Sequence, residues 1–180
     1  MIMIITVCMT AGFQETVQNK IFDFWGHIRI QEKQPSQSVI EKMNPIEKND
    51  SLIQQLERHP AILSVHPFAT QYALLKTRNE MEGILLKGVD KKVGWNKYAA
   101  FLKKGSVPKI ESSDFSRGIL VSQQQANRLQ LQVNDSLVLY FTQQEGHPRA
   151  RKVFIAGIFQ TGIDEYDRLF ALVDIRMIRQ

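Results

Sequence analysis

The sequence predicts a mixed α+β fold, and three observations lead to this prediction. The runs 136–142 and 152–159 are rich in β-branched and aromatic residues, which are typical of strands. Apolar residues recur at helical spacing between Phe13 and Phe24. Hydrophobic residues make up 43% of the 180 residues and charged residues 23%, which excludes a wholly disordered chain. We therefore expect one ordinary domain or two small ones, with helices and strands interspersed.

The first thirteen residues, MIMIITVCMTAGF, are uncharged and almost continuously apolar. A membrane span needs about 20 such residues, whereas a buried core helix needs about 10–14. Three interpretations remain open: a core helix or strand, an anchor lying against a membrane, or the last part of a transmembrane helix whose beginning lies upstream. We predict one continuous helix through Trp25, because Gly12 is its only helix breaker and a membrane helix tolerates glycine. Gly26 should end this helix.

The elements up to residue 90 follow from alternation, capping residues and turn residues. His27–Gln31 alternates with a period of two, as a half-buried strand does. The other predicted elements are a long loop or a loose hairpin over 31–51, a short helix over 52–56 capped by Asp50 or Ser51, an extended stretch over 61–76 bent at Pro67, and a strand over 83–89.

The second half of the chain carries stronger strand signals. Its predicted elements are a short helix around Tyr98, Phe101 and Leu102 that Gly105 ends, a strand over 118–121, a helix capped by Ser122, strands over 136–142 and 152–159, a strand over 169–173, and a helix starting at Asp174. Gln143–Arg151 is too long for a two-residue turn, so we expect an exposed hairpin tip there.

Enzymatic and metal chemistry have little support in the sequence. Gly83–Gly88 has the two glycines of a phosphate-binding loop, but Val89-Asp90 stands where lysine and Ser/Thr must follow. The single cysteine, Cys8, excludes an internal disulfide and a cysteine cluster. The four histidines are isolated from one another: His27, His59, His66 and His147.

Asp164, Glu165 and Asp167 form an acidic group that could hold a metal ion. We expect instead a solvated loop that caps backbone amides. We therefore predict no catalytic, metal-binding or cofactor-binding residues and no enzymatic activity. The net charge of +5 is modest and scattered, and most aromatic residues lie in apolar strands, so nucleic acid is not an expected partner.

Four segments resemble those of a known protein family in their order and spacing. They are the N-terminal helix ending Ala11-Gly12-Phe13-Gln14 and followed by Gly26–Ile30, the strand Gly83–Asp90, the stretch Gly118–Ser122 with Val133-Asn134-Asp135, and the return strand and acidic turn within 157–174. Together they resemble the lipoprotein-releasing permeases, the LolC/LolE group of the MacB/FtsX-type ABC superfamily. The resemblance covers most of residues 5–175. Asn134 stands where this family usually has glycine, a change that a left-handed turn tolerates.

The resemblance implies a MacB-type periplasmic core domain set between the first and second transmembrane helices. Residues 1–13 would then be the end of the first transmembrane helix. Residues 14–75 and 160–180 would form a porter-like α/β part, truncated at the C-terminus, and residues 76–159 a smaller, inserted β-rich part.

The resemblance also implies a function. The domain would belong to a permease subunit in the bacterial inner membrane that helps release lipoproteins, while a separate cytoplasmic ATP-binding cassette subunit hydrolyses ATP. Its partners would be that subunit, a second permease copy, and a lipoprotein or periplasmic lipoprotein carrier. Those family members that recruit the carrier do so with an extended hairpin on the inserted part, and the shorter stretch 143–151 lies at the matching place. His147, Arg149 and Arg151 are the candidate contact residues there, because arginine is suited to a partner's carboxylates.

Two other interpretations of the function remain open. A MacB-like efflux permease or an FtsX-like regulator of cell-wall hydrolases is the alternative within the superfamily. A free soluble binding module with a buried N-terminal strand is the alternative outside it.

Overall fold

The computed structural model describes residues 2–31, 46, 49–77, 80–91, 95–109, 115–141 and 149–179. The chain forms two units, Met1–Gln31 and Glu32–Gln180. In the first unit, α1 runs from Ile2 to Trp25 without a break, as predicted. Gly26 ends it with a φ of +89° and donates its backbone N–H to the carbonyl of Phe22 at 2.7 Å.

The predicted strand over His27–Gln31 is wrong. These residues have no regular structure, and Ile28 is 78% exposed. Among the described residues no strand pairs with this segment. Alternation stabilises a strand only when a neighbouring strand supplies hydrogen-bond partners, and sequence spacing carries no information about that neighbour.

The second unit begins with α2, Asp50–Glu57, which lies where a short helix is predicted. Its N-cap is Asn49, one residue before the two expected candidates. The side chain of Asn49 accepts a hydrogen bond from the backbone N–H of Leu52 at 3.1 Å. Asparagine is as good an N-cap as aspartate or serine, so the helix starts at the first suitable residue.

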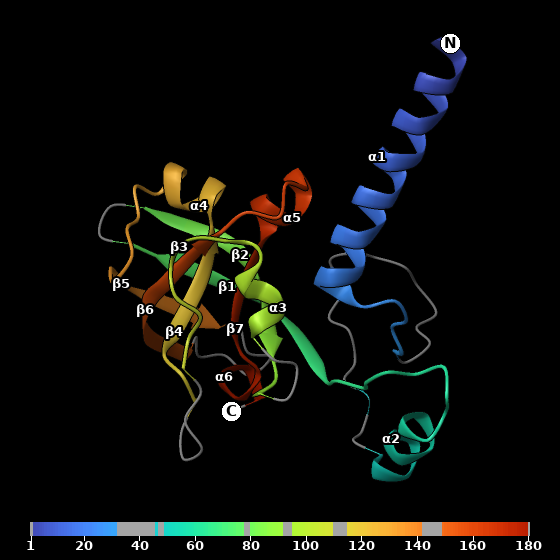
Figure 1. Cartoon of the computed structure of the whole chain (residues 1–180). Helices are drawn as coiled ribbons and strands as arrows, with labels where there is room; N and C mark the ends of the chain where they lie inside the picture. Colours follow the sequence, from blue (N-terminus) through green and yellow to red (C-terminus); the bar gives the residue numbers. More distant parts are fainter. Residues whose placement is uncertain are drawn as a thin grey trace, which may run out of the picture. The chain divides into compact units, whose positions relative to one another are not determined.

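After α2, the described residues of the second unit form seven strands and four more helices (Figure 1). The strands are β1 (Phe68–Lys76), β2 (Met81–Val89), β3 (Leu102–Gly105), β4 (Gly118–Ser122), β5 (Ser136–Phe141), β6 (Arg149–Phe159) and β7 (Phe170–Asp174). The helices are α3 (Asn96–Ala99), α4 (Gln123–Arg128), α5 (Asp164–Leu169) and α6 (Ile175–Arg179). The predicted mixed α+β class is confirmed.

The strands form a closed ring. Their order is β3-β6-β4-β7-β2-β1-β5, and β5 also pairs with β6. Six strands therefore close into a barrel, and the short β3 is added to β6 outside the ring. β6 makes this possible through its length: its first half, up to Phe154, pairs with β5, and its second half pairs with β4 and β3.

Alternate residues of the six ring strands fill the barrel. The inward side chains are Ala73, Leu75, Ile84, Leu86, Ile119, Val121, Leu137, Leu139, Phe141, Val153, Ile155, Ala171 and Val173. All are buried, and all follow the period of two that strands impose. A ring of so few strands has no room for a channel, so these side chains form the hydrophobic core.

Helices lie at both ends of the barrel (Figure 1). α4 follows the end of β4 and α5 precedes the start of β7, and because β4 and β7 are antiparallel the two helices lie side by side at one end. α6 follows the other end of β7 and contacts β1 and β2 there. The strands come from both parts of the expected division, with β1 and β7 from 14–75 and 160–180 and the others from 76–159. That division stays a prediction.

Two segments around residue 100 differ from the prediction. The helix around Tyr98 is shorter than expected, because Leu102–Gly105 is the strand β3. The edge of β6 supplies β3 with hydrogen-bond partners, and that pairing is not visible in the local sequence. The helix ends at Ala99 and not at Gly105, which is instead the last residue of β3, with a φ of +80°.

The phenol of Tyr98 is buried beside Trp95 and Lys87. The ammonium of Lys87 lies 5.6 Å from the centre of the Tyr98 ring. Burial raises the pKa of Tyr98 to about 12, because the phenolate would lose its hydration.

This pKa predicts a loss of stability in alkali. Between pH 10 and 12 the unfolded chain releases the Tyr98 proton while the folded chain retains it. The contribution of Tyr98 to the free energy of unfolding is therefore fully present below pH 10 and is lost as the pH rises toward 12. Urea unfolding of the wild type should show this decline, and Tyr98→Phe should show a shallower one. Equal pH dependence in the two proteins would contradict the assignment.

Candidate functional site

The end of the barrel that carries α4 and α5 holds an extensive set of polar side chains. α4 starts at a capping box: Ser122 Oγ accepts from the backbone N–H of Gln125 at 3.0 Å, and the Gln125 side chain accepts from the backbone N–H of Ser122 at 3.2 Å. The N-cap role of Ser122 is therefore confirmed. A helix of six residues is not stable alone, so α4 depends on its cap and its packing.

Two hydrogen bonds, one buried and one partly buried, join the start of α4 to α5. The Ser122 hydroxyl donates to the backbone carbonyl of Asp167, and Gln125 Nε2 donates to the backbone carbonyl of Arg168 at 3.2 Å. Ser122 and Gln125 are both buried. Buried polar groups that are paired in this way fix the orientation of the elements that carry them.

The acidic group expected to be a solvated loop is the helix α5, and its third carboxylate is buried. Asp167 Oδ1 accepts from the backbone N–H and the hydroxyl of Thr161, both at 2.8 Å. Asp167 Oδ2 accepts from the backbone N–H of Gly162 at 3.1 Å. The expected capping of backbone amides is thus present, but Asp164 and Glu165 are exposed while Asp167 is only 5% exposed.

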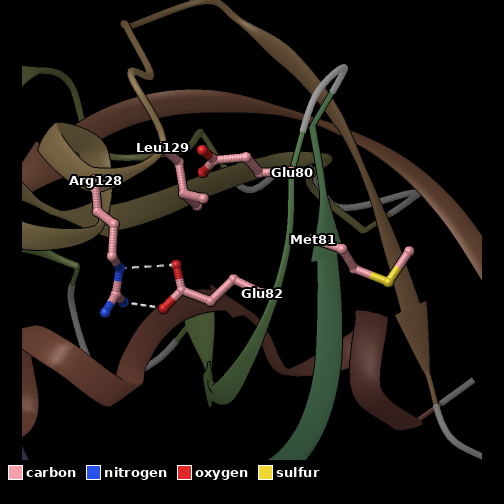
Figure 2. A pocket seen from close by; sticks show the side chains of 5 residues that line it. All are labelled: Glu80, Met81, Glu82, Arg128 and Leu129. Atoms are coloured by element: carbon pink, nitrogen blue, oxygen red, sulfur yellow. Dashed lines mark hydrogen bonds and ion pairs between the residues drawn. The ribbon is translucent and has the colours of Figure 1, made fainter.

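A first hollow, of about 380 Å³, lies on one side of α4 (Figure 2). It is lined by Glu80, Met81, Glu82, Arg128 and Leu129. The guanidinium of Arg128 binds both carboxylate oxygens of Glu82, while the side chain of Met81 points away from this pair. The pair joins α4 to the start of β2. It is partly solvated, so its contribution to stability is below about 1 kcal/mol.

A second hollow, of about 620 Å³, lies on the other side of α4. We call it the amide groove, and its lining residues are Lys104, Gln123, Ala126, Asn127, Gln130, Leu131, Gln132, Val133 and Ile158. Four of these side chains are carboxamides, four are apolar, and one is an ammonium. β3 and β6 are distant in the chain from α4 and the turn that follows it, so local sequence patterns do not predict this groove.

The opposite end of the barrel carries a second buried carboxylate. Burial alone would raise the pKa of Asp174, but hydrogen bonds from the Arg176 side chain and from the backbone N–H groups of Ser116 and Arg176 outweigh it and leave the pKa lowered. Ser116 N–H lies 3.0 Å from Asp174 Oδ2. This carboxylate therefore ties the start of α6 to the segment before β4, as a structural cap.

The predicted contact residues of the hairpin have different environments. His147 lies outside the described residues. Arg149 and Arg151 are not in a tip, because β6 begins at Arg149, three residues earlier than expected. Arg149 is exposed, whereas Arg151 is half-buried with its guanidinium 4.7 Å from the centre of the Phe115 ring. The sequence offered no signal for this pairing, since Phe115 is distant in the chain.

Among the described residues, no group of three His, Cys, Asp or Glu side chains could hold a metal ion. Gly83–Gly88, the segment with two loop-like glycines, lies within β2, as its apolar interior predicts. The end of the barrel that carries α4 and α5 therefore presents two open hollows.

No protein-family model matches the chain. Two curated proteins are similar to it along 97% of its length, and both are named lipoprotein-releasing system transmembrane protein LolC. The one from Xylella fastidiosa strain 9a5c is 22% identical over 183 residues, and the one from strain Temecula1 is 20% identical over 181 residues. The chain spans 41% of the length of each.

The solved extracellular domain of the noncanonic ABC-type transporter YknZ from Gram-positive bacteria is similar in fold. The TM-score is 0.50 at 17% identity, and the match covers 76% of this chain and 67% of that one. The resemblance to the permease group is confirmed. The comparisons support the interpretation of the chain as similar to the periplasmic domain of an ABC-type permease. Those relatives are themselves transporter components.

The N-terminal half of α1 exposes apolar side chains on all sides. Met3 is 80% exposed and Phe13 is 70% exposed, and Ile4, Ile5, Val7 and Met9 are exposed as well. Within the described part of the chain, no helix combines the length and the apolarity that crossing a membrane requires.

Proposed function

We propose that the chain is the periplasmic domain of an ABC transporter permease subunit that helps release or transfer lipoproteins from the bacterial inner membrane. The observation that carries this proposal is the similarity to two LolC proteins along 97% of the chain. The domain would be non-catalytic itself. ATP hydrolysis would belong to a cytoplasmic ATP-binding cassette subunit, and a second permease copy would complete the transporter.

The proposal places the start of α1 in the membrane. The helix carries no charge before Glu15, and a helix that is apolar on all sides requires apolar surroundings. Residues 1–13 would be the end of the first transmembrane helix. Residues 14–75 and 160–180 would form the porter-like part, and residues 76–159 the inserted β-rich part of a MacB-type core domain.

Membrane binding gives a test that separates this proposal from a free soluble module. The chain should float with phospholipid vesicles in a density gradient. Ile5→Glu combined with Met9→Glu should abolish flotation, because two charged side chains in the hydrocarbon each cost about 2.5–3.5 kcal/mol. Gln14→Glu combined with Gln18→Glu, on the polar half of α1, is the matched control and should float as the wild type does. A wild-type chain that stays at the bottom of the gradient would favour the soluble module.

The partner contact would lie at the β5–β6 hairpin, where His147, Arg149 and Arg151 would meet carboxylates of a lipoprotein carrier or partner subunit. Arg149→Ala should leave stability unchanged, since exposed charges contribute less than about 1 kcal/mol. It should weaken binding of the carrier by about 1–3 kcal/mol in a direct titration if it is a hot spot.

Arg151→Ala should behave differently, because the Arg151 guanidinium packs on Phe115. It should lower the free energy of unfolding by about 1 kcal/mol as well as weaken binding. Lys152→Ala, at an exposed outward position of β6, is the control. If both arginine variants bind the carrier as tightly as the wild type does, the hairpin is a solvated turn and not a partner contact.

Depletion of the protein in its own bacterium tests the function as a whole. Outer-membrane lipoproteins should accumulate in the inner-membrane fraction of a density gradient. Normal lipoprotein sorting with increased drug sensitivity would favour a MacB-like efflux permease. Normal sorting with a defect in cell separation would favour an FtsX-like regulator of cell-wall hydrolases.

A further inference from the structure

One side of the barrel has an apolar outer surface. We call it the outer face, and it consists of the outward side chains within 72–76 of β1, 136–140 of β5 and 150–154 of β6. These side chains alternate with those that fill the barrel, and none of them is buried. Its large apolar members are Tyr72, Leu74, Val138, Tyr140 and Phe154, of which Tyr72, Leu74 and Phe154 are 43%, 42% and 42% exposed. The outward side of an antiparallel sheet is usually polar, so an apolar surface here indicates a contact with another molecule.

The charges of the outer face have a single sign. Val138 pairs with Lys76 of β1 on one side and with Lys152 of β6 on the other, so the three residues form one row across the sheet. Both lysines are exposed, and two strand spacings separate their Cα atoms by about 10 Å. None of the described residues that form this face carries a carboxylate. The row therefore favours a partner with two negative charges about 10 Å apart.

The neighbouring row of the outer face is uncharged. It consists of Leu74, Tyr140 and Ala150, which pair with one another across the same three strands. Leu74 and Tyr140 are at least partly exposed, so an apolar surface can reach their side chains. A matching partner thus needs an apolar stripe and, along one side of that stripe, two acidic side chains.

The helix α2 of this chain has these properties. None of its eight residues is buried, although Leu52, Ile53 and Leu56 form an apolar stripe along it. Asp50 and Glu57 are exposed and lie beside this stripe, on the same side of the helix, because they are seven residues apart. A rise of 1.5 Å per residue separates them by about 10 Å along the axis. This spacing equals that of the two lysines, so α2 lying across the strands would place one carboxylate near each ammonium.

The segment between α2 and β1 favours a second copy of the chain as the source of this helix. Hydrogen bonds from the backbone N–H groups of Arg58, His59 and Ile62 hold the residues after α2 in turns, so only residues 63–67 can extend. From Ile62 to Phe68 they span about 20 Å at most, whereas Lys76 lies about 27 Å along β1 from Phe68. α2 would reach the lysines of its own chain only with this segment fully stretched, which costs entropy.

A dimer that joined two outer faces directly is disfavoured by their charges. Lysines of one copy would approach lysines of the other, with no carboxylate on either described surface to compensate them. In an exchange of α2 helices the charges are opposite. Each copy then supplies one helix and one face, so a two-fold axis gives two equal contacts and a closed dimer.

From these observations we infer that the outer face binds α2 of a second copy of this chain in a two-fold dimer. Leu52, Ile53 and Leu56 cover the apolar row, while Asp50 and Glu57 pair with Lys76 and Lys152. This contact gives a docking surface to the second permease copy of the proposed function, and it rests on that copy being this same chain. It is separate from the carrier contact proposed at the β5–β6 hairpin.

Sedimentation equilibrium of the full chain in density-matched detergent tests the inference. The wild type should show a reversible equilibrium between monomer and dimer. Lys76→Glu combined with Lys152→Glu, the face variant, should raise the Kd of the dimer at least about tenfold, because carboxylates then meet carboxylates. Asp50→Asn combined with Glu57→Lys, the helix variant, should raise the Kd similarly, because its lysine then meets the lysines of the face.

A mixture of the two variants gives the decisive measurement. α2 of the helix variant carries a lysine that meets the glutamates of the face variant. The acidic α2 of the face variant meets the unchanged lysines of the helix variant. Both contacts are attractive only in the mixed dimer, so the mixture should form 1:1 heterodimers with a Kd within about threefold of the wild type. Differently tagged copies, recovered through one tag, identify the heterodimer.

Three further variants separate the contact from general effects of charge and stability. Leu56→Ser should weaken the dimer about tenfold, because it removes part of the apolar stripe. Gln54→Lys, on the opposite side of α2, and Lys97→Glu combined with Lys109→Glu, at exposed positions outside the outer face, are the matched controls. The controls should dimerise within about twofold of the wild type, and all variants should unfold at the wild-type temperature because they change surface side chains.

Three outcomes would overturn the inference: a chain that stays monomeric at every concentration, a dimer whose Kd is the same in the face and helix variants as in the wild type, or two weakened variants that fail to pair when mixed. The second outcome would place the dimer contact elsewhere on the chain. Depletion of the protein and its effect on lipoprotein sorting do not enter this measurement, so failure of one proposal can be distinguished from failure of the other.

Discussion

Replacing Asp167 with alanine should lower the free energy of unfolding by about 3–4 kcal/mol, measured by urea denaturation. The carboxylate accepts three hydrogen bonds, from the backbone N–H and hydroxyl of Thr161 and from the backbone N–H of Gly162. Without it, the donors of the buried Thr161 lose their acceptor in a place that water does not reach. Each buried donor left unpaired costs about 1–3 kcal/mol, and the Thr161 hydroxyl recovers part of this by turning to the carbonyl of Ile163.

Two variants bracket this result. Asp167→Asn keeps one acceptor oxygen and should lose about half as much stability. Glu165→Ala removes an exposed carboxylate of the same helix and should lose less than about 1 kcal/mol. If Asp167→Ala unfolds within about 1 kcal/mol of the wild type, the carboxylate does not cap the turn in solution.

Replacing Gly105 with alanine should cost about 3–4 kcal/mol, from two additive effects. The φ of +80° at Gly105 disfavours any residue with a Cβ. That Cβ would also clash with the backbone carbonyl oxygen of Ala156 and lie 2.7 Å from the Cα of Gly157. Both neighbours are backbone atoms of β6, so the strain can be relieved only by moving β3 away from its partner strand.

Gly83→Ala is the matched control for this experiment. Gly83 also lies in a strand, but its φ is not positive and the nearest atom to an added Cβ is Leu74 Cδ2 at 4.0 Å. The control should be neutral or slightly stabilising in thermal unfolding. A Gly105→Ala protein that unfolds like Gly83→Ala would show that β3 is not paired with β6 in solution.

Most helices and strands of this chain could be predicted from local patterns in its sequence. The N-terminal helix, the strand ending at Ser122 and its N-cap, and the left-handed Asn134 were predictable because each depends on neighbours within four residues or so. The permease resemblance was likewise readable from the order of short segments. Periodicity and capping are local properties, and these are the properties that sequence reports directly.

What the sequence did not predict depends on pairings between distant residues. The burial of Asp167 requires the turn at Thr161 to fold back over α5, which turned an expected solvated loop into a buried cap. Arg151 was expected in a hairpin tip, but β6 extends far enough to place it beside Phe115. The amide groove joins β3 to α4 and the turn after it, which the pairings of β6 with β3 and β4 bring together. Each of these features is decided by strand order, which local patterns do not encode.

The register of β2 has a mechanical consequence. Val89 pairs with Phe68 of β1 on one side and with Asp174 of β7 on the other, so the start of β1 and the end of β7 lie only two strand spacings apart, about 10 Å. A force that pulls the start of β1 away from β2 would load the end of the β1–β2 ladder at the Phe68–Val89 pair, and its hydrogen bonds would break one after another rather than all at once.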